Sequence, residues 1–431
     1  MHHRRWIFRS VIILLTVCYC LQVFTPLRLN NDAIVLLSMG ESAAHGRGFL
    51  DEGRPTVFPQ AYPALLSMML RLGVASSSVI VGMNVLFLAV GMLALRSLLL
   101  QSVTQNEATI QSIVILSLLS FVVVKHFPVP LTDIPFFGVA MSCVAVTTYA
   151  SKLKPASRQF LQWMFLSWFL VLVSIFFRRN GVALVPMVIW MLLFRAEARA
   201  RFRRIATRTQ IGVVLISMGA GIAMAWGIGK TSTLRDVSSV VRGADLLRLP
   251  FQVMNYRLTE LGELAANIPK SKFPFSDEIV FPSIGVVVLF LVGGGLRALR
   301  RECRYHVEAV DVFVVSYVAI LFVWPYYDTR FWVPVVPLLI AYAGQFFSHV
   351  LRSRLLRRVV AVYMAVFVAL GLLALGYSTR ITFAGPKFPD RWGDGTLRPT
   401  YCAALNSCGS SFDERNVNAK ALHLLRVYKQ R

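Results

Sequence analysis

The sequence predicts an all-α integral membrane protein that crosses the bilayer about eleven times. Three observations predict this fold class: 56% of the 431 residues are hydrophobic, only 15% are charged, and the mean hydropathy is +0.62. Soluble domains have about 45–50% apolar and about 25% charged residues. A single aqueous core could not bury so much apolar surface, so we expect lipid to surround this chain.

A helix that crosses a bilayer needs about 20 mostly apolar residues, and such stretches recur along the chain. The first follows a basic start and has no small-residue cleavage site after it, so we expect an uncleaved helix rather than a signal peptide. The predicted spans are 7–24, 77–99, 110–124, 131–149, 160–177, 181–194, 211–228, 281–296, 312–324, 331–347 and 359–377.

The basic residues predict how these helices are oriented. Lysine and arginine gather in cytoplasmic loops. With a cytoplasmic N-terminus, the basic loops at 152–158, 195–208, 297–304 and 352–358 all fall on that side. The turn at 101–109 has no basic residue and departs from this pattern. Because the basic residues lie between spans and not on one soluble face, the net charge of +24 predicts membrane anchoring and no nucleic acid partner.

This orientation places three polar stretches outside the cytoplasm: 25–76, 229–280 and 378–431. Within the first, we expect a helix over 33–44, a glycine- and proline-rich turn, and a second helix at 62–72. The second helix is short for a span, so it is predicted to lie at the membrane interface. The chain thus divides into a transmembrane domain, 1–377, and a short basic tail, 378–431, whose Cys402 and Cys408 could form a disulfide outside the cytoplasm.

Two aspartates lie where predicted spans meet the outer face. Asp32 comes soon after the first span, and Asp133 stands at the outer end of the fourth. A carboxylate at the boundary of hydrocarbon is costly unless it is hydrated, paired or functional. Each could instead cap the N-terminus of a helix, so both interpretations stay open.

The segments around these acids resemble the GT-C membrane glycosyltransferases, in the branch of protein O-mannosyltransferases and the lipid A aminoarabinose transferase. An acid follows the first span, a small-residue helix then ends in a Gly-x-Gly turn, and a Tyr-Pro pair opens the next helix. Three later segments also match the family and extend the resemblance over about 8–347. They are Leu131-Thr132-Asp133-Ile134-Pro135-Phe136, Arg178-Arg179-Asn180-Gly181 and Tyr326-Tyr327-Asp328-Thr329-Arg330-Phe331-Trp332-Val333-Pro334-Val335-Val336-Pro337.

The resemblance implies an inverting transfer of a sugar from a polyprenyl phosphate to a lipid, glycan or protein acceptor at the outer face of the membrane. Asp32 would be the general base, and Asp133 would orient the acceptor. Basic groups would stabilise the leaving phosphate, although each could instead anchor lipid headgroups. The residues expected to bind the donor phosphate or the acceptor are Arg330, Arg178, Arg179, Lys125, Glu41, His45 and Tyr62.

Metal dependence stays open, because some branches of this superfamily use a divalent metal and others do not. Asp32 and Asp133 would be the ligands of Mg²⁺ or Mn²⁺, both of which prefer oxygen. Ala33 follows Asp32 where many relatives have a second acid, which disfavours a metal.

The alternative function is a transporter or lipid flippase of the cell envelope. Transporters keep charged residues within their spans and often have repeated halves, whereas these acids lie at the outer face and no repeat is visible. A non-catalytic subunit of an envelope complex stays open as well. We expect the protein in a bacterial inner membrane, in contact with membrane lipids.

Overall fold

The structure is a computed structural model of residues 1–431. It describes residues 2–103, 106–154, 157–194, 248–273, 278–302, 307–350, 353–392, 396–408 and 414–429. The predicted span at 211–228 and the basic loop at 195–208 lie outside the described residues.

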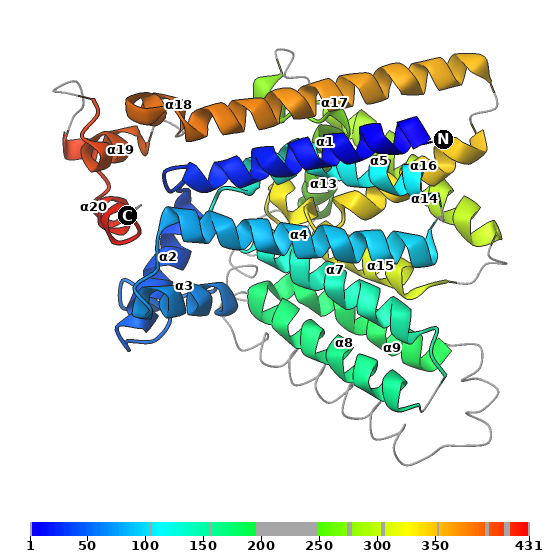
Figure 1. Ribbon diagram of the computed structural model, residues 1–431, viewed down its shortest axis with the longest axis horizontal. Helices are drawn as coiled ribbons and strands as arrows, with labels where there is room; N and C mark the ends of the chain where they lie inside the picture. The colour runs from blue at the N-terminus through cyan, green and yellow to red at the C-terminus, as the bar shows by residue number, and fades with distance from the viewer. Residues whose placement is uncertain are drawn as a thin grey trace.

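Helices dominate the described residues (Figure 1). Five are long and apolar enough to cross a membrane: α4 (Ser77–Ser102), α7 (Asp133–Ala150), α8 (Arg158–Phe177), α14 (Val280–Glu302) and α17 (Arg354–Thr382). Shorter apolar segments are α1 (His2–Leu21) with η1 (Gln22–Phe24), α5 (Glu107–Leu118), η2 (Arg179–Ala183) with α9 (Leu184–Phe194), α15 (Ala309–Val323) and α16 (Val336–Val350). These ten segments overlap ten of the eleven predicted spans.

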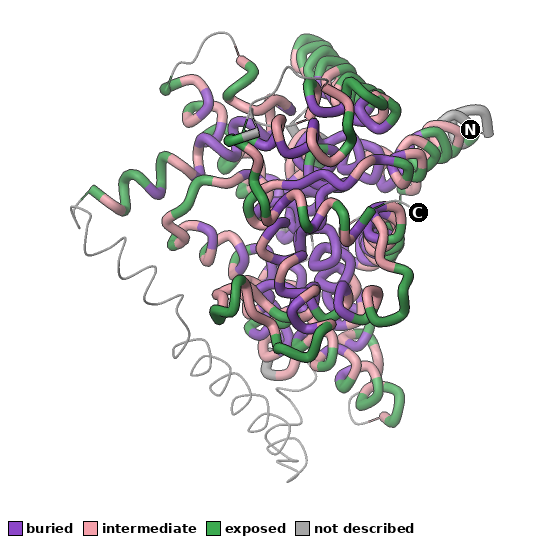
Figure 2. Tube along the Cα trace, turned by 90° about the vertical axis from the view of Figure 1, so that its left-hand side faces the viewer, coloured by how far each residue is buried: buried purple, intermediate pink, exposed green. Residues whose placement is uncertain are grey.

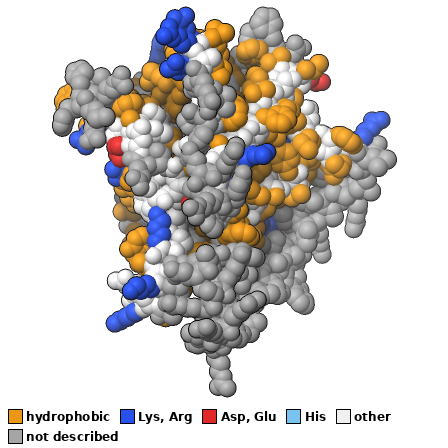
Figure 3. Space-filling model, turned by 90° about the vertical axis from the view of Figure 1, so that its right-hand side faces the viewer, with side chains coloured by type: hydrophobic (Ala, Val, Ile, Leu, Met, Phe, Trp, Pro, Cys, Tyr) orange, Lys and Arg blue, Asp and Glu red, His pale blue; other side chains and the backbone are white. Residues whose placement is uncertain are grey.

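The surface of this bundle is apolar, as a lipid environment requires. On α8, for example, Phe165, Phe169 and Phe176 are largely exposed. Hydrophobic side chains cover much of the described surface in Figure 3, while buried residues concentrate in the centre of the molecule (Figure 2). Apolar residues that point outward from long helices are typical of membrane-spanning bundles.

The predicted span at 110–124 is wrong as a single helix. The structure breaks it into α5 and α6 (Phe121–His126), with Leu119 and Ser120 between them. The side chain of buried Asn267 binds the freed backbone here: it accepts from the Phe121 N–H (2.7 Å) and donates to the Leu119 carbonyl (3.0 Å). Broken helices are tolerated inside a membrane bundle where the protein itself satisfies the backbone.

Asn267 follows a helix that the sequence did not predict, α13 (Leu249–Ala266), which is followed by η3 (Lys270–Lys272). α13 packs closely against α14, because Gly262 and Gly285 let the two backbones approach. A Cβ atom on Gly262 would lie 2.0 Å from the Phe281 carbonyl oxygen. The stretch 229–280, which the sequence predicts to lie outside the cytoplasm, therefore contains a helix that inserts charged side chains into the protein interior.

The stretch 25–76, predicted to lie outside the cytoplasm, contains the expected helix, turn and second short helix. α2 (Asn31–Ala44) and α3 (Ala61–Arg71) flank a short hairpin whose strands, β1 (Leu50–Asp51) and β2 (Arg54–Pro55), have two residues each. α3 has 11 residues, or about 17 Å of helix, which is little more than half of the hydrocarbon thickness. Its length is therefore compatible with a position at the interface.

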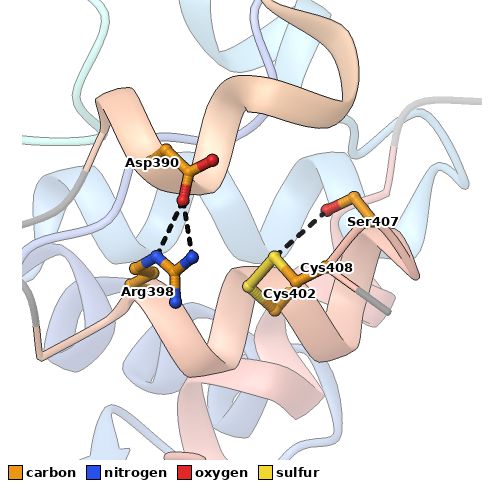
Figure 4. The surroundings of a disulfide bond; sticks show 5 residues. All are labelled: Asp390, Arg398, Cys402, Ser407 and Cys408. Carbon is orange, nitrogen blue, oxygen red and sulfur yellow. Dashed lines mark hydrogen bonds and ion pairs between the residues drawn. A yellow bond between two sulfur atoms is a disulfide. The ribbon is translucent and has the colours of Figure 1, made fainter. Parts of the chain in front are cut away.

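The tail folds back onto this first stretch, at the end of the bundle opposite the N-terminus (Figure 1). Its elements are η5 (Gly385–Lys387), α18 (Phe388–Arg391), α19 (Arg398–Leu405), η6 (Glu414–Asn416) and α20 (Ala419–Val427). The Tyr401 hydroxyl donates to the Leu27 carbonyl (2.8 Å) and accepts from the Leu29 N–H (2.7 Å). Cys402 and Cys408 form the disulfide that the sequence allowed (Figure 4).

Arg28 fixes the start of α2 to the end of α17. Its buried guanidinium donates to the Ser378 hydroxyl (2.9 Å) and carbonyl (2.8 Å) and to the Thr382 hydroxyl (3.0 Å). Trp392 of the tail covers the guanidinium at 5.1 Å. Burial lowers the pKa of Arg28 to about 10, so the side chain stays charged at neutral pH and holds these segments together.

Candidate active site

Asp32 and Arg330 form an ion pair between elements almost 300 residues apart in sequence. Asp32 lies in the first turn of α2, and Arg330 lies in the short helix η4 (Thr329–Trp332). Arg330 also pairs with Asp328 through its Nε, 2.6 Å from Oδ2. The Asp32 carboxylate is 29% exposed, so it is the part of this pair that a substrate could reach.

The helix-capping alternative for Asp32 is wrong. Asn30 is the N-cap of α2, where its side chain accepts from the Ala33 N–H at 2.8 Å. The carboxylate of Asp32 is therefore available for Arg330. An acid in the first turn of a helix also interacts favourably with the helix dipole.

Asp133 and Arg178 form a second ion pair, which is buried. Asp133 begins α7, and its side chain is not used as an N-cap, because the cap residue is Thr132. Asn84 of α4 holds the loop between α6 and α7 by donating a hydrogen bond to the Phe127 carbonyl at 2.7 Å. Burial lowers the pKa of Arg178 to about 10, so its guanidinium remains charged.

The Phe331 ring brings the two pairs together. The guanidinium carbon of Arg178 lies 4.8 Å from the ring centroid, and that of Arg330 lies 5.4 Å from it. The structure therefore gathers the predicted residues Asp32, Asp133, Arg178 and Arg330 in one cluster. Each guanidinium group is paired with carboxylates, Arg178 with Asp133 and Arg330 with Asp32 and Asp328, so an anion that binds here competes with those acids.

His126, at the end of α6, also lies near this cluster, since the charges of Arg330 and Arg178 affect its pKa, and Lys125 precedes it in the chain. His126 is buried, and its Nε2 has no hydrogen-bond partner among the described residues. Its pKa is lowered well below the usual value by burial and by the charges of Lys125, Arg330 and Arg178. The imidazole is therefore neutral at physiological pH. Lys125 is exposed, so it can meet an anion from solvent.

α13 supplies buried charged residues that the sequence did not identify as part of a site. Arg257 and Glu260 pair at 2.8 Å with both side chains fully buried. Glu260 also accepts from the Asp328 N–H and from the Trp332 indole, each at 2.7 Å. The signal in the sequence was the spacing of Arg257, Glu260 and Glu263 at three-residue intervals, which puts them on related sides of a helix.

The other predicted site residues on α2 and α3 do not join the cluster. Glu41 and Asp32 are nine residues apart, so they point to opposite sides of α2, about 180° apart. Glu41 pairs with His423 of the tail at 2.7 Å, and His45 is exposed. Tyr62 is fully buried, and its ring contacts protein and not solvent.

Glu41 lies instead in a cavity of about 380 Å³ between α2, the hairpin and α20. The described residues that line it include Ser38, Arg47, Lys420 and His423. Arg179 lies partly exposed in η2, next to Arg178. Substrate contacts of Glu41, His45, Tyr62 and Arg179 remain predictions.

A metal site at Asp32 and Asp133 does not fit this arrangement. Each carboxylate is paired with a guanidinium group and the two acids do not contact each other in any described interaction. Within the described ranges, no group of three histidine, cysteine, aspartate or glutamate residues could hold a metal ion. Hard cations need several oxygen ligands without a competing cation beside them.

Comparisons with known proteins give structural likenesses only. No family model and no curated protein matches the chain. It is similar to ArnT from Cupriavidus metallidurans bound to undecaprenyl phosphate, with 13% identity, 98% of this chain and 74% of that chain covered, and a TM-score of 0.49. It is also similar to the archaeal oligosaccharyltransferase AglB from Archaeoglobus fulgidus, crystallised with an inhibitory peptide and a dolichol-phosphate, with 12% identity and a TM-score of 0.49. That match covers 96% of this chain and 60% of the archaeal chain. Likeness at these values does not identify a family or an activity.

Proposed function

We propose that this protein is a membrane glycosyltransferase that transfers a sugar from a polyprenyl phosphate to a hydroxyl group of an acceptor. The observation that carries this proposal is the convergence of Arg178 and Arg330 on Phe331, beside the partly exposed carboxylate of Asp32. These residues come from three segments that resemble GT-C enzymes. Sugar transfer from a lipid phosphate requires a base for the acceptor hydroxyl close to cations that bind the phosphate, and this cluster contains both kinds of group.

In the proposed reaction, the acceptor oxygen attacks the anomeric carbon of the sugar while Asp32 takes the hydroxyl proton. The bond between the anomeric carbon and the phosphate oxygen breaks, and its electron pair leaves with the polyprenyl phosphate. Arg330 and Arg178 stabilise the negative charge that develops there, since guanidinium groups bind phosphate through two parallel hydrogen bonds. Neutral His126 can donate or accept one further hydrogen bond.

Arg330 couples the donor to the base. In the structure its guanidinium is shared between Asp32 and Asp328. A phosphate that binds Arg330 competes with Asp32 for the guanidinium and loosens its contact. Once released, the carboxylate is a stronger base, because a nearby cation favours the charged form of an acid. Asp328 remains on Arg330 and keeps the guanidinium in place.

The experiment begins with the lipid-linked sugars of cells that lack the protein, because accumulated donor names the sugar. Transfer of that sugar is then measured in membranes that contain the wild type or Asp32→Asn. We expect a loss of about 10²–10⁴-fold, the usual contribution of a general base. Asp390→Asn is the control, since Asp390 is an exposed acid of the tail paired with Arg398 (Figure 4). Full activity of Asp32→Asn would remove the aspartate from this role, and lipid movement without sugar transfer would favour a flippase.

A further inference from the structure

Glu260 contacts both ends of the short helix that carries Arg330. One carboxylate oxygen, Oε1, accepts from the Asp328 N–H just before η4, at 2.7 Å. The other oxygen, Oε2, accepts from the indole N–H of Trp332, the last residue of η4, also at 2.7 Å. The Glu260 side chain is fully buried, so it has no contact with solvent to exchange for these bonds.

Arg257 reinforces this attachment from the preceding turn of α13. It pairs with Oε2 of Glu260 at 2.8 Å and donates a hydrogen bond to the Tyr326 carbonyl. α13 thus contacts this segment at three points: Tyr326 before η4, Asp328 at the start of η4 and Trp332 at its end. A buried ion pair is weak evidence for stability, because desolvation offsets much of the attraction. The Arg257–Glu260 pair matters here because it fixes the position of the segment around η4.

We propose that Glu260 is a positioning residue, which fixes η4 so that Arg330 faces both Asp32 and the phosphate of a lipid donor. This inference rests on the proposed function, because it assigns Glu260 a role in that same phosphate site. Glu260 does not touch the substrate. It acts through the backbone of Asp328 and the side chain of Trp332.

A carboxylate is suited to this role because it accepts hydrogen bonds at both oxygens. Glutamine has one acceptor oxygen, and its amide nitrogen would face a second donor. Protonation of Glu260 has a similar effect, since one oxygen then carries a hydrogen. Burial raises the pKa of Glu260 to about 7, against the opposing effects of Arg257, the Trp332 indole and the Asp328 N–H. The Asp328 carboxylate raises it further.

The test uses undecaprenyl phosphate as the probe, bound to the purified full-length protein in lipid nanodiscs at pH 8 and pH 6. With Glu260→Gln, we expect affinity at pH 8 to fall by about tenfold or more, as when a hydrogen bond to a charged group is lost. The wild type should lose affinity between pH 8 and pH 6 by more than this variant does. Titration of the phosphate itself affects both proteins equally, so the difference reports on Glu260.

Asp311→Asn is the matched control for the loss of a buried acid. Asp311 also pairs with an arginine, Arg300 at 2.6 Å, and accepts from an aromatic side chain, Tyr342 at 2.8 Å. Asp311 lies at the start of α15, and none of its described contacts is with Asp32, Asp133, Arg178 or Arg330. We expect it to lower thermal stability and to leave both the affinity and its pH dependence as in the wild type.

Trp332→Phe is the second variant, in case Glu260→Gln does not fold. It removes one of the two hydrogen bonds and leaves Glu260 paired with Arg257, so affinity should fall by a few-fold in a folded protein. Binding by Glu260→Gln and Trp332→Phe as tight as that of Asp311→Asn would overturn the positioning role. An equal loss in all three would overturn it too, since it would indicate general destabilisation. Failure of the wild type to bind the probe would overturn the proposed function together with this inference.

Discussion

The buried pair of Asp133 and Arg178 allows structural and functional roles to be separated. The side chains are 2% and 10% exposed, so neither charge has solvent to compensate for a missing partner. Asp133→Asn leaves Arg178 charged and buried, and loss of one partner of such a pair costs about 3–5 kcal/mol. Replacing both, with Asp133→Leu and Arg178→Met, removes both charges and should cost less than about 1 kcal/mol or even stabilise.

The assay is the free energy of unfolding in mixed detergent micelles, measured beside undecaprenyl phosphate binding. The control is Glu107→Gln, because the Arg96–Glu107 pair is exposed, at 50% and 30%, and such pairs contribute about 0–1 kcal/mol. The double variant should recover stability and still lose phosphate binding, since it lacks the Arg178 guanidinium. Two results would refute this reasoning. One is an Asp133→Asn cost as small as that of the control, and the other is wild-type phosphate binding by the stable double variant.

Three further predictions concern the fold that supports the site. Asn267→Ala removes three hydrogen bonds between the Asn267 side chain and buried backbone groups. The free energy of unfolding should therefore fall by about 3 kcal/mol or more. A loss under about 1 kcal/mol would contradict this. Gly262→Ala should cost about 1–3 kcal/mol or more, because its Cβ would overlap the backbone of α14, whereas Gly293→Ala, where a Cβ meets nothing within 4 Å, should not destabilise. Cys402→Ser with Cys408→Ser removes a crosslink across six positions, worth about 2 kcal/mol in chain entropy. Limited proteolysis should then cut the tail faster, and an unchanged rate would show that its other contacts suffice.

The sequence alone predicted the apolar helices, the short helices of the first outer stretch and the residues of the cluster. Apolar runs and their periodicity depend on local composition, so ten apolar segments could be located without a structure, five of which are long enough to cross a membrane. Asp32, Asp133, Arg178 and Arg330 were singled out because charged residues at the ends of apolar runs are costly and because their segments resemble those of a known family.

Tertiary structure decided how these residues pair. No local signal shows that Asp32 meets Arg330 while Asp133 meets Arg178, because such pairing depends on how helices far apart in sequence pack. The break between α5 and α6 was hidden for the same reason: Asn267, 146 positions beyond Phe121, satisfies the backbone there. The role of Glu260 depends on α13, whose charged residues look like those of a solvated loop until the fold buries them. Composition therefore determined which segments form apolar helices in a membrane, and long-range packing determined which charged side chains pair with one another.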